Sequence, residues 1–311
     1  MKIIRSVPSR PPAKGGTAIT IGNFDGVHAG HRALIARLNK LAEAEDLSTI
    51  LITFDPHPQK VLHGKAPDAL TTFDQKMRLL EAEGLDRVVV IPFTAAFSRT
   101  EPEAFMSKIL VKALDAKAIV IGANFRFGRF ARGDTAMLKA FGKNAGFTTN
   151  AVKIAAVAGR PVSSREIRHA LVQGDVSWAA KALGTAHALP GKIIRGHSRG
   201  KRLLGYPTAN LKPAAGMASV GPGVYAGEVT FGQSKRRHAA AISVGTNPTF
   251  GVNPLSIEAF LLDFDSQIYG SKAEFRFVAR LRDQKTFSSP AALSEAIAHD
   301  VVLTRKALSK A

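Results

Sequence analysis

The sequence predicts a two-domain protein, with a Rossmann-like α/β domain over residues 1–186 and a mainly antiparallel β-barrel with a C-terminal helix over residues 187–311. Three observations support this fold class. A chain of 311 residues has room for two domains, each with its own hydrophobic core. Apolar, β-rich runs alternate with helical patterns in the first half. Short strand-like runs, separated by glycine, proline and asparagine turns, fill the second half.

Strands in the first half are expected where short apolar runs rich in β-branched residues are bounded by turn residues. They cover residues 17–21, 48–54, 87–93, 117–122 and 148–154. Two of the intervening helices are expected to open with capping boxes, Thr72-x-x-Gln75 and Thr100-x-x-Glu103, which satisfy the first backbone N–H groups of a helix. Alternating strands and helices indicate a parallel sheet, which binds ligands at the carboxyl ends of its strands.

The pattern changes after Gly184. Strands are expected over residues 191–195, 223–231, 239–244, 256–263 and 273–282, and a helix over residues 291–307. Consecutive strands of this length favour an antiparallel barrel. Gly184 and Pro190 end a helical segment over residues 178–183, so we place the domain boundary between residues 186 and 187.

Composition narrows the class of protein. The chain has no cysteine, which excludes disulfides, thiolate catalysis and cysteine-based zinc sites. No apolar run approaches the roughly 20 residues that span a bilayer, and residues 1–16 are basic and broken by prolines, so we expect a cytoplasmic protein without membrane partners. The net charge of +19 indicates anionic partners. Because nucleic-acid recognition patterns are absent from the sequence, small polyphosphates are favoured over specific nucleic acid.

Residues 22–31 carry the most informative motif, because they join a predicted strand to a predicted helix through a glycine-punctuated turn. Backbone N–H groups and the positive end of the helix dipole converge at such a junction and bind phosphate. His28 and His31 add donors that can face a polyphosphate, and Gly30 between them lets the backbone approach closely. The candidate binding residues of this motif are Gly22, Asn23, Phe24, Asp25, His28, Gly30 and His31.

Two other interpretations of the histidines remain open. Zinc is bound by histidines at this spacing, but a zinc site needs three or four ligands and no cysteine is present to supply them. A histidine at the start of a helix also serves as a simple cap. The strand before the motif and the helix after it favour the nucleotide site.

Three further segments are expected to contribute to a nucleotide site in the first domain. His57 lies in Thr-Phe-Asp-Pro-His-Pro (residues 53–58) at a strand end, where it is either part of a rigid turn or a contact to phosphate or ribose. Asn124 follows the fourth predicted strand, with Phe125 and Phe127 available to form the wall of a pocket for a flat ring. Residues 163–168 open a helix, where Ser163, Ser164 and Arg168 suit a phosphate, although an ordinary serine cap has the same pattern.

Together these segments resemble, in order, the adenylyltransferase half of the bacterial bifunctional riboflavin kinase/FAD synthetases. The resemblance rests on Gly-Asn-Phe-Asp-Gly-Val-His-x-Gly-His, Thr-Phe-Asp-Pro-His-Pro, the Gly-x-Asn-Phe loop and Ser-Ser-x-x-Ile-Arg. It implies transfer of a nucleotide from ATP to FMN, which gives FAD and pyrophosphate. It also implies catalytic roles for Asn23, His28 and His31. Arg165 stands where the family usually has Thr or Ser.

The second half resembles riboflavin kinases. Residues 205–210 look like the Pro-Thr-Ala-Asn motif of that family, and residues 242–249 and 257–264 also match it. The resemblance implies that ATP phosphorylates riboflavin to FMN, with Mg²⁺ held near Thr208 and Asn210 and with Glu258 as the base. Further nucleotide contacts are expected from Gly191, Lys192, Gly205 and Pro207. Alternation in the predicted strand also places Glu258 on one face with Phe260 and Leu262.

The sequence therefore predicts a bifunctional enzyme with ATP as co-substrate at two sites, Mg²⁺ as cofactor, and riboflavin and FMN as its other small-molecule substrates. Three alternatives remain: a nucleotidyltransferase whose barrel only binds substrate, a class I tRNA synthetase, which shares a His-x-Gly-His loop, and a basic nucleic-acid-binding module. No lysine-rich second signature loop of a synthetase is found in the sequence. Oligomeric state, domain orientation and the redox state of the flavin are not predicted.

Overall fold

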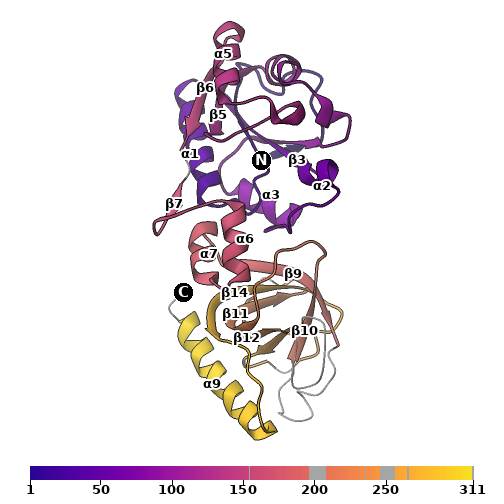
Figure 1. Cartoon of the computed structure of the whole chain (residues 1–311), viewed down its shortest axis with the longest axis vertical. Helices are drawn as coiled ribbons and strands as arrows, with labels where there is room; N and C mark the ends of the chain where they lie inside the picture. The colour runs from indigo at the N-terminus through magenta and orange to yellow at the C-terminus, as the bar shows by residue number, and fades with distance from the viewer. Residues whose placement is uncertain (154, 196–207, 235, 246–255, 265, 310–311) are drawn as a thin grey trace. The chain divides into compact units, whose positions relative to one another are not determined.

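A computed structural model describes residues 1–153, 155–195, 208–234, 236–245, 256–264 and 266–309 (Figure 1). The contacts of the chain divide it into two compact units. The first comprises Met1–Ala69 and Phe73–Ser163, and the second Leu70–Thr72 and Ser164–Ala311. The helices over residues 164–183 thus pack with the second unit, whereas the sequence places them in the first domain. The functional boundary between residues 186 and 187 stays a prediction.

The first unit is built on a six-stranded sheet in the order β1-β4-β3-β2-β5-β6, with every pair parallel. Its strands are β1 (Lys2–Ile4), β2 (Thr17–Ile21), β3 (Ser48–Asp55), β4 (Arg87–Pro92), β5 (Ala116–Gly122) and β6 (Thr148–Val152), followed by a small hairpin of β7 (Ala156–Val157) and β8 (Arg160–Pro161). Its helices are α1 (Ala29–Ala44), α2 (Pro58–His63), α3 (Phe73–Glu81), η1 (Phe97–Arg99), α4 (Pro102–Ala104), the π-helix η2 (Phe105–Ala113), η3 (Arg129–Ala131) and α5 (Thr135–Ala145).

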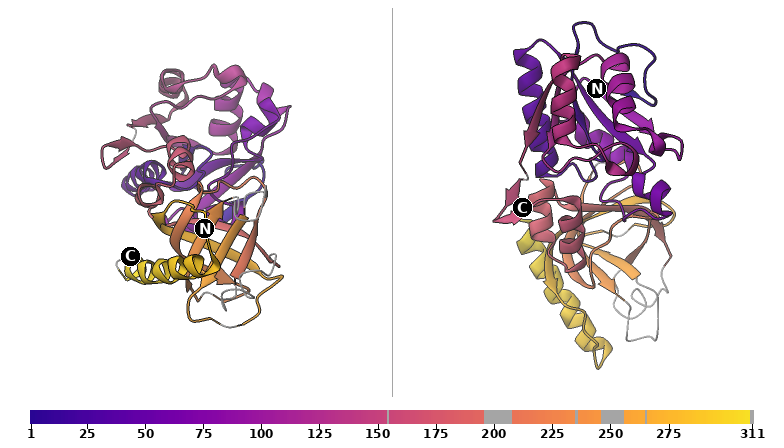
Figure 2. Two further views of the ribbon diagram at one scale, coloured as in Figure 1. Left: turned by 60° about the horizontal axis from the view of Figure 1, so that its bottom comes forward. Right: turned by 45° about the horizontal axis from the view of Figure 1, so that its top comes forward.

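Alternate residues of the parallel strands form two separate cores, one on each face of the sheet. Ile19, Ile52 and Ile121 pack with η2 and α5. Ala18 and Leu51, adjacent in the chain to two of these residues, pack with α1 and α3 on the opposite face. Both faces of the sheet are therefore covered by helices (Figure 2), as a parallel sheet requires, and its carboxyl edge remains for ligands.

The second unit is a closed barrel in the order β10-β13-β12-β11-β14-β9, with antiparallel pairing throughout. Its elements are α6 (Ser164–Val172), α7 (Val176–Leu183), β9 (His187–Ile194), β10 (Thr208–Pro213), β11 (Gly223–Phe231), β12 (His238–Gly245), β13 (Ser256–Leu261), β14 (Lys272–Arg282) and α9 (Pro290–Leu308). Helix α9 packs along β11, β12 and β14. Its buried Asp300 accepts two hydrogen bonds from Arg282 of β14, at 2.9 and 2.8 Å.

These two units confirm the predicted fold class, and the bounds of β2 and β11 are those that the sequence predicts. One predicted cap is wrong. Glu101, not Thr100, is the N-cap of α4, and its side chain makes no capping hydrogen bond. The reason is that Pro102 takes the first helical position, which its fixed φ favours, so the helix begins one residue later than a Thr100 capping box requires.

Candidate functional site

The turn between β2 and α1 has a strained backbone held by specific hydrogen bonds. Phe24 and Val27 have φ angles of 50° and 39°, although both carry a Cβ and both are fully buried. Non-glycine residues in this region cost about 1–3 kcal/mol each and persist only where their surroundings enforce them. Here the N–H of Gly22 donates to the carbonyl of Ile52 at 3.0 Å, and the N–H of Val27 donates to that of Phe24 at 3.3 Å.

His28 and His31 lie together at the N-terminus of α1, as the sequence predicts. Their rings stack with centroids 3.7 Å apart and an angle of 16° between their planes. His28 is the N-cap of α1, because its Nδ1 accepts a hydrogen bond from the N–H of His31 at 3.4 Å. Neutral His28 therefore carries its proton on Nε2. A Cβ on Gly30 would lie only 3.2 Å from the His28 ring, so glycine here makes room for that ring.

His31 is held neutral by its surroundings. Burial lowers the pKa of His31 well below 6.5, and the neighbouring positive charges of His28, Lys76 and Arg32 lower it further. Its buried Nδ1 has no hydrogen-bond partner among the described residues. A buried polar atom without a partner is costly, and a ligand oxygen would satisfy it. The two histidines are thus both structural parts of the turn and candidates for ligand contact.

His57 joins this turn to the loop after β3. It is the N-cap of α2, where its Nδ1 accepts a hydrogen bond from the N–H of Gln59 at 3.2 Å. On the other side of the ring, its Nε2 forms a side-chain hydrogen bond with the Nδ2 of Asn23 at 3.2 Å. The structure thus brings together two of the predicted segments, those containing Asn23 and His57.

Lys76 of α3 also lies at this turn, and sequence reasoning missed it. Its Nζ donates to the carbonyl of Asn23 and to the Oγ1 of Thr53, each at 3.3 Å. Burial lowers the pKa of Lys76, whereas the carboxylates of Asp25 and Asp55 oppose that shift. Nothing in the periodicity of α3 distinguishes this lysine from a solvent-exposed one, because its contacts come from β2 and β3.

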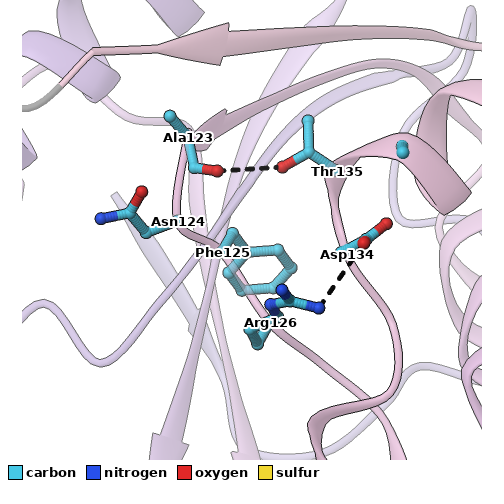
Figure 3. A pocket seen from close by; sticks show the side chains of 7 residues that line it. Ala123, Asn124, Phe125, Arg126, Asp134 and Thr135 are labelled. Atoms are coloured by element: carbon cyan, nitrogen blue, oxygen red, sulfur yellow. Dashed lines mark hydrogen bonds and ion pairs between the residues drawn. The ribbon is translucent and has the colours of Figure 1, made fainter.

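A cavity of about 320 Å³ lies at the end of β5 and the start of α5 (Figure 3). Asn124, Phe125 and Arg126 line one part of it, and Asp134 and Thr135 another. Arg126 pairs with Asp134 at 3.5 Å, and the hydroxyl of Thr135 donates to the carbonyl of Ala123 at 3.4 Å. The other residues that line this cavity are Ala123 and Ala136. Asn124 therefore borders a cavity at the carboxyl edge of the sheet, where a ligand of a parallel sheet is expected.

Phe125 and Phe127 have different places in this region. Phe125 lines the cavity, whereas Phe127 is buried and stacks on Phe125, with ring centroids 5.7 Å apart and an angle of 13°. Phe127 also contacts Phe105 of the core. Phe127 therefore supports Phe125 from the core and is not among the residues that line the cavity.

For the other predicted residues of the first nucleotide site, the structure gives a position in the fold but does not test phosphate binding. A Cβ on Gly22 would lie 3.2 Å from the ring of Phe24, which is a tight contact. Ser163 is the last residue of the first unit, and Ser164 and Arg168 lie on α6 in the second unit. Their contact with phosphate stays a prediction. Within the described part of the chain, no cluster of three or more His, Cys, Asp or Glu residues is arranged to hold a metal ion.

In the barrel, three adjacent strands present a polar row on one face. Glu258 of β13 is paired in register with Asn210 of β10 on one side and with Ser243 of β12 on the other. Residues directly opposite in an antiparallel pair share a face, and Thr208, two residues before Asn210, lies on that face too. Ile257, Ala259 and Leu261 are buried on the opposite face. Phe260 shares the face of Glu258 as predicted, but Leu262 lies beyond the end of β13.

Lysines form a second row across the same barrel face. Lys192 of β9 is paired with Lys212 of β10 and with Lys272 of β14, and all three are exposed. Lys212 lies two residues from Asn210, so this row adjoins the polar row on the same face. Like charges directly opposite in a sheet destabilise it, and a bound anion relieves their repulsion. A Cβ on Gly191, the residue before Lys192, would overlap the carbonyl oxygen of Lys212, so glycine permits the close pairing of β9 with β10.

Several predicted contacts of the second site lie outside the described residues. They are Gly205, Pro207 and the segment over residues 246–249. The described oxygen donors, Thr208, Asn210 and Glu258, suit Mg²⁺, which uses one or two carboxylates together with substrate phosphates rather than a full protein cage. The donor set therefore fits the cofactor that the sequence predicts. Among the helices of the described residues, none combines the length and the apolar character that a membrane span requires.

Comparison with known proteins gives two family models that together match most of the chain. The model described as FAD synthetase matches residues 10–166, and the one described as riboflavin kinase matches residues 183–308. The bifunctional riboflavin kinase/FMN adenylyltransferase of Escherichia coli K12 is 33% identical over 308 residues, which cover 98% of this chain and 97% of the relative. That of Listeria monocytogenes is 33% identical over 295 residues, which cover 94% and 92% of the two chains.

A solved structure supports the same full-length fold. The chain titled macrolide-efflux protein from Streptococcus pneumoniae is 28% identical, has a TM-score of 0.87, and is matched over 98% of this chain and 99% of that one. Both predicted halves are thus present in one order in full-length relatives. The chain belongs to the bifunctional riboflavin kinase/FMN adenylyltransferase family, and its two ATP-using activities make FMN from riboflavin and FAD from FMN.

Proposed function

We propose that the polar row of the barrel carries the kinase reaction, with Glu258 as the base and Thr208 and Asn210 as the residues that hold Mg²⁺. The pairing of Glu258 with Asn210 supports this proposal, because a carboxylate and a side-chain amide stand directly opposite each other on two barrel strands. Glu258 accepts the proton of the riboflavin 5′-hydroxyl. The oxygen of that hydroxyl forms a bond to the γ-phosphorus of ATP, and ADP leaves. Bound Mg²⁺ supplies neutralisation of the charge on the phosphates.

Lys192 fits the role of a phosphate contact in the same reaction. Its row with Lys212 and Lys272 adjoins Asn210, and clustered ammonium groups suit a triphosphate. We assign further nucleotide contacts to Gly191 and, outside the described residues, to Gly205 and Pro207. These assignments are supported by the motif order and not by a described contact.

For the adenylyl transfer, we propose that the β2–α1 turn binds the ATP phosphates. An oxygen of the FMN phosphate bonds to the α-phosphorus, and pyrophosphate leaves, so no protein nucleophile is needed. The Nε2–H of His28, the imidazole of His31 and the N-terminus of α1 stabilise charge that develops on the phosphates. The unpartnered Nδ1 of His31 supports a ligand at this position.

The cavity beside Asn124 and Phe125 suits a flat ring of one of the two substrates of this reaction. We assign a catalytic role to Asn23 and nucleotide contacts to Asp25 and His57 of the same region, and Ser163, Ser164 and Arg168 are proposed as further phosphate contacts. We also propose a cytoplasmic location and no specific nucleic-acid partner, since the substrates account for the positive charge.

A single chromatographic experiment tests these assignments. Purified protein is incubated with ATP and Mg²⁺ and either riboflavin or FMN, and the flavins are separated. Glu258→Gln should lose FMN formation from riboflavin and keep FAD formation from added FMN, and His31→Ala should show the reverse. Loss of both reactions in either variant, each measured with its own substrate and with the protein still folded, would contradict the assignment of each site to its own unit.

A further inference from the structure

Lys76 stands at a junction of three elements that the proposed adenylyl-transfer site depends on. Its Nζ donates to the Asn23 carbonyl and to the Thr53 Oγ1, each at 3.3 Å. The Thr53 hydroxyl in turn donates to the same Asn23 carbonyl at 3.1 Å, so the three groups form a closed triangle. Asn23 lies in the β2–α1 turn, Thr53 is a fully buried residue of β3, and Lys76 comes from α3.

The place of this triangle in the turn is informative. The carbonyl of Asn23 immediately precedes Phe24, the first residue whose φ is positive. A turn with positive φ at two buried non-glycine residues needs external contacts to keep its shape. The Asn23 carbonyl receives two such contacts, and its side chain adds a third at His57. Lys76 therefore holds the β2–α1 turn at Asn23, just before the chain continues to the two histidines.

Burial and the neighbouring carboxylates act in opposite directions on the charge of Lys76. The carboxylates of Asp25 and Asp55 raise the pKa of Lys76, against the larger effect of burial, which lowers it. A buried cation is costly unless it is paired or used. This one lies close enough to the histidines to lower the pKa of His31. Its positive charge is thus placed next to the region proposed to bind ATP phosphates.

We propose that Lys76 is a positioning residue for the adenylyl transfer, which holds the β2–α1 turn through the Asn23 carbonyl so that His28 and His31 face the phosphates of ATP. This inference rests on the phosphate-binding role proposed above for the two histidines. Lys76 acts through the turn and need not touch substrate. The kinase reaction, in the other family domain, does not depend on it.

The test compares Lys76→Met, Lys76→Arg and Lys40→Met in the full-length protein. Lys76→Met keeps the aliphatic stem and removes the charge and donors, and Lys40 is an exposed lysine of α1 that serves as the matched control. For FAD formation from FMN, we expect kcat to fall by roughly 10- to 100-fold in Lys76→Met, the scale on which misplaced catalytic groups lose rate. KM for FMN should change less than kcat. Lys76→Arg should recover part of the rate, and Lys40→Met should match the unaltered protein.

A pH profile of the same reaction separates positioning from a merely structural role. The groups that act on His31 are His28 and Arg32 of the α1 region and Lys76 of α3, and Arg32 is paired with Glu83 at 2.9 Å. Lys76 disfavours a proton on His31, so its loss raises the pKa of His31. The acid limb of kcat should therefore move to higher pH in Lys76→Met and stay in place in Lys40→Met.

Three results would overturn the inference: an unchanged kcat in Lys76→Met, an acid limb that does not move, or equal loss of kinase activity. The unfolding temperature of each variant is measured so that rates are compared for folded protein only. His31→Ala is included to distinguish this inference from the proposed function. If His31→Ala retains FAD formation, the role of the histidines fails, whereas if it loses FAD formation and Lys76→Met does not, only the role of Lys76 fails.

Discussion

Asn210 and Glu258 lie directly opposite each other in the antiparallel pairing of β10 with β13. Side chains so paired share a face of the sheet, with Cβ atoms typically about 4.5–5.5 Å apart. Two motifs distant in the sequence thus present a proposed metal ligand and a proposed base side by side. Because both stand on strands of a closed barrel, their separation is fixed by the backbone ladder and not by a loop.

Glu258→Gln tests the proposed base of the kinase reaction. The substitution keeps the size of the side chain and removes its proton acceptor, so FMN formation should fall by about 10²-fold or more. FAD formation from added FMN should stay near that of the unaltered protein. Glu295→Gln, at an exposed position of α9, is the control. A similar loss of both activities would show that Glu258 is structural.

His31→Ala distinguishes phosphate binding from zinc binding at the turn. If His31 stabilises the ATP phosphates, FAD formation should fall by roughly 10²–10³-fold with kinase activity retained. His28→Ala should lose FAD formation as well and also about 1 kcal/mol of stability, because His28 is the N-cap of α1. His63→Ala, an exposed position on α2, is the control. Stoichiometric zinc in protein purified without chelator would overturn the phosphate assignment.

The depressed pKa of His31 predicts a pH dependence of stability. In the unfolded chain this histidine titrates near 6.5, whereas in the folded protein its pKa lies well below that value. The unfolded state therefore binds more protons below pH 6.5, and stability is lost as the pH falls from about 6.5 through the folded pKa. Denaturant unfolding at several pH values should show a smaller loss over this window in His31→Gln than in the unaltered protein. If the free energy of unfolding changes equally with pH in the two proteins, this prediction is wrong.

A fragment of the second unit should make FMN and no FAD. The sequence predicts this for a fragment that starts near Leu189. The structure adds that α7 packs on β9 and β14, and that His187 of β9 contacts the carbonyl of Ala218 at 2.7 Å. A fragment that starts at Ser164 keeps these contacts, so it should unfold at a higher temperature than one that starts at Leu189. A folded Ser164 fragment without kinase activity would contradict the assignment of the kinase to the second unit.

Much of the fold follows from local pattern. The strands β2 and β11 are bounded by turn residues and rich in β-branched or apolar residues, so their limits are visible in the sequence. Strand β1, with only three residues, was missed, because it forms through parallel pairing with β4 and not through its own propensity. Strand β10 was missed as well, since its residues were interpreted only as a chemical motif.

The candidate site was predicted where motif residues are adjacent in the chain and missed where packing supplies them. His28 and His31 stand one helical turn apart, and their spacing alone places them together at a helix start. Lys76 enters from α3, and its burial depends on the positions of Asn23 and Thr53 in other elements. The contact of His57 with Asn23 is likewise tertiary. The spacing of residues within one helix or strand gives no information about contacts between different elements.

The row of Lys192, Lys212 and Lys272 has a consequence for the folding equilibrium of the barrel. The three ammonium groups repel one another in the folded strands and separate in the unfolded chain. If the ATP phosphates bridge these ammonium groups as proposed above, ATP binds the folded form in preference and raises the free energy of unfolding as its concentration rises. The resistance of the barrel to unfolding would then follow the supply of its own co-substrate.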